Sequence, residues 1–317
     1  MTVSVIIPSF NAEKWIRATI RSVQRQTVHD IEIIAVDDGS KDNTAAIIRS
    51  EFSEVQLIRT PNHGASHART VGARAACGDF IQYLDADDLL TPGKIEIQLE
   101  ALKNTGADVA YGDWQKLVPG ENGEFVPGEL FARKMRRTPE IELFTDFWCP
   151  PAAYLFRRRI VESVGGWNQN LPIIQDARYV LDCALAGAHF AYCPGVMAMY
   201  RVHGNESLSR QNPVAFVRDV YRNACEVEQW WHQNGGLGEE RRQALITCYG
   251  YVARASYEKD RESFDRAYSA LMRFTDRYIP DGPPHLKIAA RLIGYPGAEA
   301  VATAYRRAKQ YFGIGQA

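Results

Sequence analysis

The sequence predicts an α/β protein built around a mostly parallel sheet flanked by helices, with a helical region at its C-terminal end. Short apolar runs recur through the first hundred residues, and helical patterns bounded by turn residues separate them, which is typical of β-α-β units. Beyond Pro213 no clear strand pattern remains, and helix-forming, aromatic and charged residues dominate. We therefore expect two regions, residues 1–212 and 213–317.

The first predicted strand covers residues 3–7, a continuous apolar run of the kind found in strands that are covered on both faces. Asn11 lies in the turn that follows and is the candidate N-cap of a helix. Five residues of that helix fall on one face: Trp15, Ile16, Thr19, Ile20 and Val23. A second buried strand, residues 31–36, stops at Asp37 and Asp38 and completes a first β-α-β unit.

The same alternation continues after this unit. Asp42 or Asn43 is expected to cap a helix that ends near Phe52, and residues 55–59 form the third strand. A helix over residues 66–77 then leads into the fourth strand. Strands that alternate with helices at this spacing indicate a parallel arrangement.

The fourth predicted strand begins at Phe80 and ends in three carboxylates within four residues, Asp85, Asp87 and Asp88. Unpaired carboxylates are costly at the edge of a core, whereas a divalent cation that prefers oxygen ligands would make their clustering useful. The alternative is that Asp87 or Asp88 caps the helix expected to start near Pro92. This stretch alone leaves both interpretations open.

Ligands of parallel sheets bind at the carboxyl ends of the strands. Ser9, Asp38 and the acids after the fourth strand all follow strand ends, so we expect them to gather at one edge. The later elements are less regular: helices over 92–104, 158–164 and 176–186, strands over 108–113, 153–156, 190–193 and 196–200, an exposed hairpin over 118–126, and a tight loop at Gly165-Gly166-Trp167.

Composition excludes several classes of protein. The formal net charge is −1 and the pI is about 6.7, so no nucleic-acid partner is expected. The six cysteines include no C-x-x-C pair, which argues against a zinc site and a disulfide framework and favours a reducing, cytoplasmic location. No apolar run approaches the roughly 18 residues of a membrane span, and the N-terminus has no signal-peptide pattern. The sequence predicts no particular oligomeric state.

Four motifs occur in a recognisable order and spacing: Ser4–Asn11, Val36–Ser40, Asn62-x-Gly64 with Ala68-Arg69, and Leu84–Asp88. Together they resemble the family 2 glycosyltransferases over about the first 210 residues. The resemblance implies a GT-A fold and inverting transfer from a nucleotide sugar, most simply a UDP-sugar, to a hydroxyl of a glycan or glycolipid, as in cell-surface polysaccharide biosynthesis. The alternatives are a non-catalytic nucleotide-sugar-binding protein and a sugar-1-phosphate nucleotidyltransferase, although the glycine-rich basic loop of the latter is absent after the first strand.

The resemblance also assigns residues to the nucleotide site. Pro8 and Phe10 lie in the first motif, with Phe10 packing near the base, and Asp38 accepts a hydrogen bond from the base. Arg69 faces the donor diphosphate, although Thr70 replaces the Asn that usually follows it. The alternative roles are a turn for Asp38, the core for Phe10 and a solvated helix face for Arg69.

The resemblance identifies Asp85 and Asp87 with the family's D-x-D motif, in which Asp87 ligates Mn²⁺ or Mg²⁺ and Asp85 lies nearer the ribose. Asp176 takes the position of the catalytic base, preceded by Gln175 where the family usually has Glu. An Asp at a helix start is also a common N-cap. His203 resembles a histidine that closes the donor site near the phosphates or the metal, and a structural role is its alternative.

The segment from residue 285 to 317 contains five basic residues and one acid among scattered apolar side chains. Such a basic amphipathic segment can lie in the headgroup plane of an anionic membrane. We therefore expect peripheral contact with the inner face of the membrane. The alternative is a terminal helix that packs its apolar side on its own domain.

Overall fold

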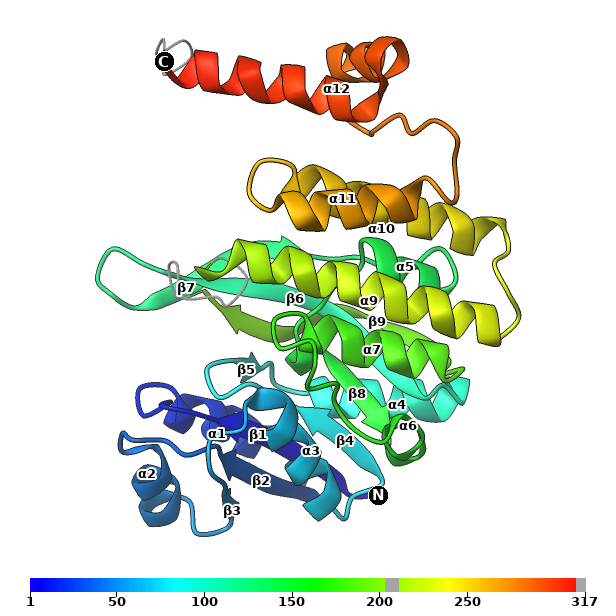
Figure 1. The fold of residues 1–317 in the computed structure, drawn as a ribbon. Helices are drawn as coiled ribbons and strands as arrows, with labels where there is room; N and C mark the ends of the chain where they lie inside the picture. Colours follow the sequence, from blue (N-terminus) through cyan, green and yellow to red (C-terminus); the bar gives the residue numbers. More distant parts are fainter. Residues whose placement is uncertain (203–210, 312–317) are drawn as a thin grey trace. The chain divides into compact units, whose positions relative to one another are not determined.

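The computed structural model describes residues 1–202 and 211–311 (Figure 1). The chain divides into two compact units, Met1–Gln211 and Asn212–Ala317. The first unit contains the sheet. In the second unit, the described residues form helices and no strand. The expected α/β fold with a helical C-terminal region is confirmed.

In the described part of the chain, nine strands form one mixed sheet: β1 (Val3–Ser9), β2 (Ile31–Asp37), β3 (Gln56–Arg59), β4 (Phe80–Tyr83), β5 (Leu89–Leu90), β6 (Val109–Pro119), β7 (Phe125–Phe131), β8 (Tyr154–Arg157) and β9 (Phe190–Arg201). Their order is β3-β2-β1-β4-β8-β6-β9-β5, with β7 paired to β6. The strands β1 to β4 are parallel to one another, and β8 is antiparallel to both of its neighbours. The expected hairpin is present, since β6 and β7 pair Val118 with Val126.

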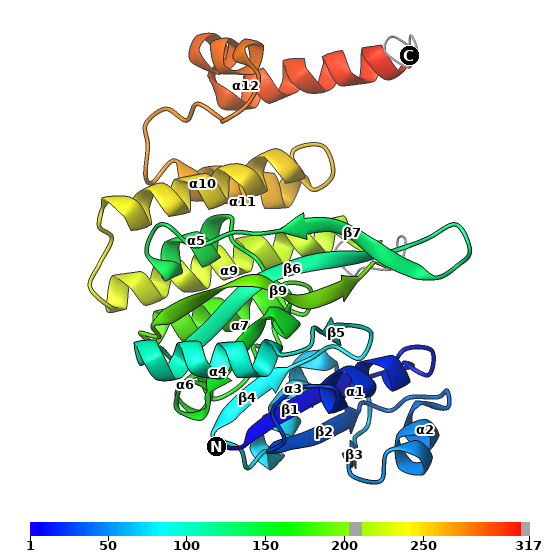
Figure 2. The same cartoon turned by 180° about the vertical axis from the view of Figure 1, so that it is seen from behind.

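The helices of the first unit are α1 (Ile16–Gln24), α2 (Thr44–Glu51), α3 (Ala65–Ala75), α4 (Lys94–Thr105), α5 (Pro139–Thr145), α6 (Arg158–Val164) and α7 (Gln175–Leu185), with the 3₁₀ turn η1 (Pro151–Ala153). Helices α3 and α7 cover one face of the sheet and α1 and α4 the other (Figures 1 and 2). At Gly72 of α3, a Cβ would lie 2.4 Å from a methyl carbon of Ile6, so glycine allows α3 to pack closely on β1.

Two sequence predictions about local structure are wrong. Asn11 does not cap α1, because the chain first makes a turn and Trp15 occupies the N-cap position; the side chain of Asn11 instead accepts a hydrogen bond from the backbone of Lys41. Residues 190–201 form one strand rather than two. Gly195, at φ 104°, takes up a bulge in β9, and its N–H donates to Asp113, so pairing with β6 resumes beyond it.

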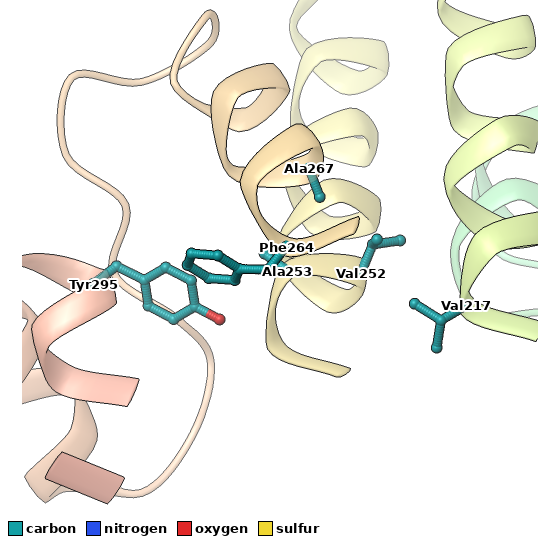
Figure 3. Packing of buried hydrophobic residues seen from close by; sticks show 6 residues of the cluster. All are labelled: Val217, Val252, Ala253, Phe264, Ala267 and Tyr295. Carbon is teal, nitrogen blue, oxygen red and sulfur yellow. The ribbon is translucent and has the colours of Figure 1, made fainter. Parts of the chain in front are cut away.

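The second unit consists of α9 (Pro213–Gln233), α10 (Glu239–Ser256), α11 (Arg261–Leu271) and α12 (Pro284–Tyr311). Its core contains Val217, Val252, Ala253, Phe264, Ala267 and Tyr295, and Figure 3 shows the rings of Phe264 and Tyr295 facing each other. Gly294 has non-helical dihedral angles (φ 75°, ψ 164°), so α12 is two helical segments joined at a kink. No helix in the described parts of the chain combines the length and the apolarity needed to cross a bilayer.

Candidate active site

The site is built at the carboxyl ends of three adjacent parallel strands. Strand β1 pairs with β2 and β4 in a register that aligns Ser9 with Asp37 and Ile6 with Tyr83. The residues that follow these strands therefore share one edge of the sheet, as the alternation of strands and helices predicted. Phe10 is 48% exposed there, whereas Pro8 is buried within β1. An exposed aromatic ring at a strand end is available for contact with a ligand.

Asp38 is bonded to the loop between β3 and α3. Its Oδ1 accepts hydrogen bonds from the Thr60 hydroxyl (3.2 Å) and the His63 N–H (3.0 Å), and its Oδ2 accepts one from the Gly64 N–H (2.7 Å). The neighbouring Asp37 is fully buried and forms an ion pair with Arg59 (2.8 Å). Both acids therefore hold the backbone near the ends of the first strands. Asp38 does so through Gly64, which is the N-cap of α3.

Arg69 connects three elements. It is only 4% exposed, and its guanidinium lies over the ring of Trp167 at 4.3 Å. One terminal nitrogen pairs with Asp85 (2.5 Å), and the other donates to Gln175 Oε1 (3.0 Å). Gln175 also accepts a hydrogen bond from the Ser66 hydroxyl (2.6 Å). The alternative of a solvated helix face is wrong for Arg69, because burial and a carboxylate partner hold the side chain inside the site.

The acids after β4 are crowded and buried, which disfavours their charged forms. Burial raises the pKa of Asp85 against the lowering effect of Arg69, and the charges of Asp87 and Asp176 raise it further. Burial also raises the pKa of Asp88 well above its usual range, with added repulsion from Asp87 and Asp85. Asp88 accepts a hydrogen bond from the Arg201 N–H (2.9 Å) through one oxygen, and its other oxygen is buried without a partner.

The capping alternative for these acids is wrong. Helix α4 begins only at Lys94, with Gly93 in the N-cap position and no side-chain cap. The carboxylate of Asp88 instead accepts a hydrogen bond from the backbone N–H of Arg201 in β9. The guanidinium of Arg201 donates to the backbone oxygen of Asp87. A contact between residues more than a hundred positions apart therefore fixes the loop that carries the acids.

Tyr200 reveals that the carboxylates converge. Its pKa is raised by burial and then by the negative charges of Asp88, Asp85, Asp176 and Asp87. Contacts join the same groups, because Arg69 bridges Asp85 and Gln175 and Trp148 links Asp176 to Tyr200, so the acids after β4 and the acid of α7 share one site. Tyr200 lies near the end of β9, which brings this strand to the site as well.

Asp176 is in the first turn of α7 and is not its N-cap, since Ile174 occupies that position. Its Oδ2 accepts a hydrogen bond from the indole N–H of Trp148 (2.8 Å), and its Oδ1 accepts one from the Ala177 N–H (2.9 Å). The carboxylate is thus oriented from two sides while the residue remains partly exposed. This is the arrangement expected of an acid that must meet a substrate in one orientation.

The acids fit a hard divalent cation. Among the residues that the structure describes, no three His, Cys, Asp or Glu side chains form a ready-made metal centre. Magnesium in particular is usually held by one or two carboxylates together with substrate phosphates and water, so a complete protein cage is not required. Asp87 and the unpartnered oxygen of Asp88 supply oxygen ligands of this kind. His203 lies outside the described residues.

Sequence reasoning missed several residues of this site. Tyr200 and Arg201 stand three and two positions before His203, within the stretch that the resemblance had singled out, so the signal was adjacent. Trp148 lies in an irregular region without periodicity, and only the fold brings it to Asp176. Gln175 was recognised as a departure from the family, but its contacts with Arg69 and Ser66 could not be predicted.

A mixed sheet whose parallel strands end in an acidic site is the arrangement of GT-A nucleotide-sugar transferases. The fold is similar to that of S. aureus TarS 1-349, with a TM-score of 0.61 and 18% identity over 97% of this chain and 92% of that one. The chain belongs to glycosyl transferase family 2, whose sequence model matches residues 4–165. It is therefore a glycosyltransferase.

Two relatives illustrate the family. The uncharacterized glycosyltransferase EpsJ of Bacillus subtilis is 30% identical over 269 residues, which cover 81% of this chain and 72% of that protein. The UDP-Glc:alpha-D-GlcNAc-diphosphoundecaprenol beta-1,3-glucosyltransferase WfgD of Escherichia coli is 37% identical over 116 residues, or 36% of this chain and 46% of that protein. The second match thus spans less than half of the relative.

The Arg69–Asp85 pair should contribute strongly to stability. We expect Arg69→Met to lower the free energy of unfolding by about 3 kcal/mol, because it leaves Asp85 desolvated beside Asp87 and Asp176 without a cation. Urea unfolding followed by circular dichroism measures the change. Arg17→Met is the matched control, since its pair with Glu51 is exposed and such pairs contribute little. Equal destabilisation by the two substitutions would contradict the role given to Arg69.

Proposed function

We propose that the chain transfers a sugar, with inversion, from a nucleotide-diphosphate sugar to a hydroxyl of a glycan or glycolipid acceptor. The observation that carries this proposal is the set of contacts that joins the acids after β4 to Asp176: Arg69 bridges Asp85 and Gln175, and Trp148, which donates to Asp176, contacts Tyr200. The name of WfgD, with a UDP-glucose donor and a lipid-linked acceptor, supports a UDP-sugar and a role in cell-surface polysaccharide synthesis. We assign this chemistry to residues 1–212.

The charge of the site explains why a cation would be needed. Four acids lie with two arginines, Arg69 and Arg201, and the raised pKa values of Asp85 and Asp88 show that further negative charge is costly there, so an anionic diphosphate would need a cation beside it. Asp87, with Asp85 and Asp88 beside it, would hold Mn²⁺ or Mg²⁺. When bound, the ion would supply positive charge to the diphosphate and to the departing nucleotide. Phe10 would pack against the base, with Asp38 holding the loop beside it.

Asp176 would act as the general base. In an inverting transfer the acceptor oxygen attacks the anomeric carbon from the face opposite the leaving nucleotide, and a carboxylate takes the proton of that hydroxyl. Trp148 and the Ala177 N–H hold the Asp176 carboxylate in one orientation. Family membership disfavours a nucleotidyltransferase, and an oriented carboxylate disfavours a protein that only binds nucleotide sugars. Calorimetry with a panel of nucleotide sugars and Mn²⁺ tests the donor class.

Asp87→Ala should weaken Mn²⁺-dependent binding of UDP by about a hundredfold or more, because the cation loses a charged ligand. Calorimetric titration of UDP with and without Mn²⁺ measures this change. Asp30→Ala is the control, since Asp30 is an exposed acid at the opposite, amino end of β2. If the variant kept the metal dependence of the unchanged chain, Asp87 would not be a ligand.

Asp176→Asn should reduce turnover by a factor of roughly 10²–10⁴ while UDP affinity stays nearly constant. The amide oxygen can still accept the Trp148 hydrogen bond, but the amide group is far less basic. Turnover is followed as UDP released from the best donor of the panel in the presence of acceptor. Asp182→Asn, on the same helix and paired with Arg178, serves as the control and should remain active. A collapse of UDP affinity in the Asp176 variant would assign this residue to donor binding.

We also propose that α12 binds the anionic inner face of a membrane. One side of its second segment is buried against its own unit through Ala298 and Thr303, and Arg306 pairs with Glu258. Both segments expose large apolar residues, including Leu292 (78% exposed) before the kink and Tyr305 (66%) after it. The exposed Arg291 and Arg307 accompany them. Packing on its own unit therefore accounts for only one face of α12, and basic residues beside apolar ones complement anionic headgroups.

A double variant tests this membrane proposal. The full chain should pellet with vesicles that contain phosphatidylglycerol and much less with neutral phosphatidylcholine vesicles. Leu292→Asp with Tyr305→Asp should weaken binding by about tenfold or more, because apolar burial is lost and negative charge is added. Ile97→Asp, at an exposed position of α4, is the control. Equal pelleting of all three proteins would limit α12 to packing within its own unit.

A further inference from the structure

Trp148 is placed and oriented in an unusual way. It is 36% exposed, although tryptophan loses most from contact with water, and it stands beside the proposed base rather than in the core. Its indole nitrogen donates a hydrogen bond to Asp176 Oδ2 at 2.8 Å, so the ring lies directly beside the carboxylate. An exposed aromatic ring that touches a reactive carboxylate can contact whatever that carboxylate acts upon.

The aromatic surroundings hold this indole in place. Trp148 makes edge-to-face contacts with Trp114 (5.2 Å, 88°) and with Tyr200 (5.6 Å, 85°). Trp114 is itself buried and stacked on Phe131 of β7 at 4.1 Å. The indole is thus supported by strands β6, β7 and β9, and its direction is fixed before any ligand arrives. A rigid ring of this kind binds with little loss of side-chain entropy.

The chemistry of such a surface matches a sugar ring. The electron-rich face of an indole attracts the polarised C–H groups on the flat side of a pyranose, whereas the hydroxyls of the sugar point outward from its rim. A sugar packed against Trp148 would bring a hydroxyl within the 2.6–3.2 Å or so that proton transfer to Asp176 requires. An acyclic polyol or a lipid alcohol offers no flat ring for this contact.

We infer that Trp148 is the platform for the acceptor, and that the accepting hydroxyl therefore belongs to a sugar ring. The same residue has a second role, because its N–H orients the base. The inference rests on the proposed function and adds the chemical class of the acceptor. Trp148 is therefore both a specificity residue and a positioning residue, and these two roles can be separated by substitution.

Two substitutions divide the roles. Trp148→Phe keeps an aromatic ring but has no N–H for Asp176, so turnover should fall while the KM for the acceptor changes little. Trp148→Gln keeps an N–H donor but has no ring, so affinity for the acceptor should fall by about tenfold, the value of one aromatic contact. Trp230→Phe, a half-buried tryptophan of the second unit, is the control and should change neither quantity.

Binding can be observed without turnover. We would label the indole nitrogens of the full chain with ¹⁵N and record their N–H signals by NMR. The chain is saturated with UDP and Mn²⁺ before octyl glucoside, octyl galactoside or octyl N-acetylglucosaminide is added. The N–H signal that disappears in Trp148→Phe should shift with at least one glycoside and stay in place with 1-octanol. Normal UDP affinity in each variant, measured by calorimetry, shows that the variant is folded.

Two results would overturn the inference while leaving the donor chemistry intact: a Trp148 signal that no glycoside moves, or a Trp148→Gln variant with full affinity for the glycoside. If the unchanged chain failed to bind UDP or any other nucleotide of the donor panel, the proposed function would fail, and the acceptor platform would fail with it. The calorimetric arm therefore distinguishes the two failures.

Discussion

The ion pair between Arg69 and Asp85 is the contact on which the arrangement of the site depends. Arg69 comes from α3 and Asp85 follows β4, so the pair fixes a helix to a strand end. Such a pair is favourable only where close geometry and further hydrogen bonds offset the loss of hydration. Gln175 provides one of these bonds, and in doing so ties α7 to the same point. Asp176 is the next residue of α7, so this anchoring also holds its backbone at the site.

A neutral residue at position 175 has a clear consequence for the charges. A carboxylate there would compete with Asp85 for Arg69, whereas the amide oxygen accepts hydrogen bonds from Arg69 and Ser66 and leaves the ion pair intact. Arg69 thus remains paired with Asp85, beside which the proposed cation would lie, and Trp148 donates to Asp176, the proposed base. The proposed donor role thus belongs to the acids beside Arg69, and the proposed acceptor role belongs to Asp176 and Trp148.

Local sequence patterns predicted the elements whose structure is determined by neighbouring residues. The strands β1 to β4 and the acids at their ends were found because apolar runs and turn residues are read within a few positions. The partners of those acids could not be found in this way: Arg201 reaches Asp88 across 113 positions, and Trp148 reaches Asp176 from a segment without periodicity. Asn11 and the bulge at Gly195 show the same limit, because pairing with distant backbone overrides the local preference.

The loop held by Asp38 connects two parts of the proposed nucleotide site. Gly64, whose N–H binds Asp38, is the N-cap of α3, and the same helix carries Arg69 one turn further on. A change at Asp38 would therefore be transmitted along a rigid helix to the acids of the site. For enzyme redesign, this means that nucleotide preference cannot be altered at Asp38 as an isolated module. Libraries that aim at a new donor would need to vary the loop, α3 and the acidic cluster together.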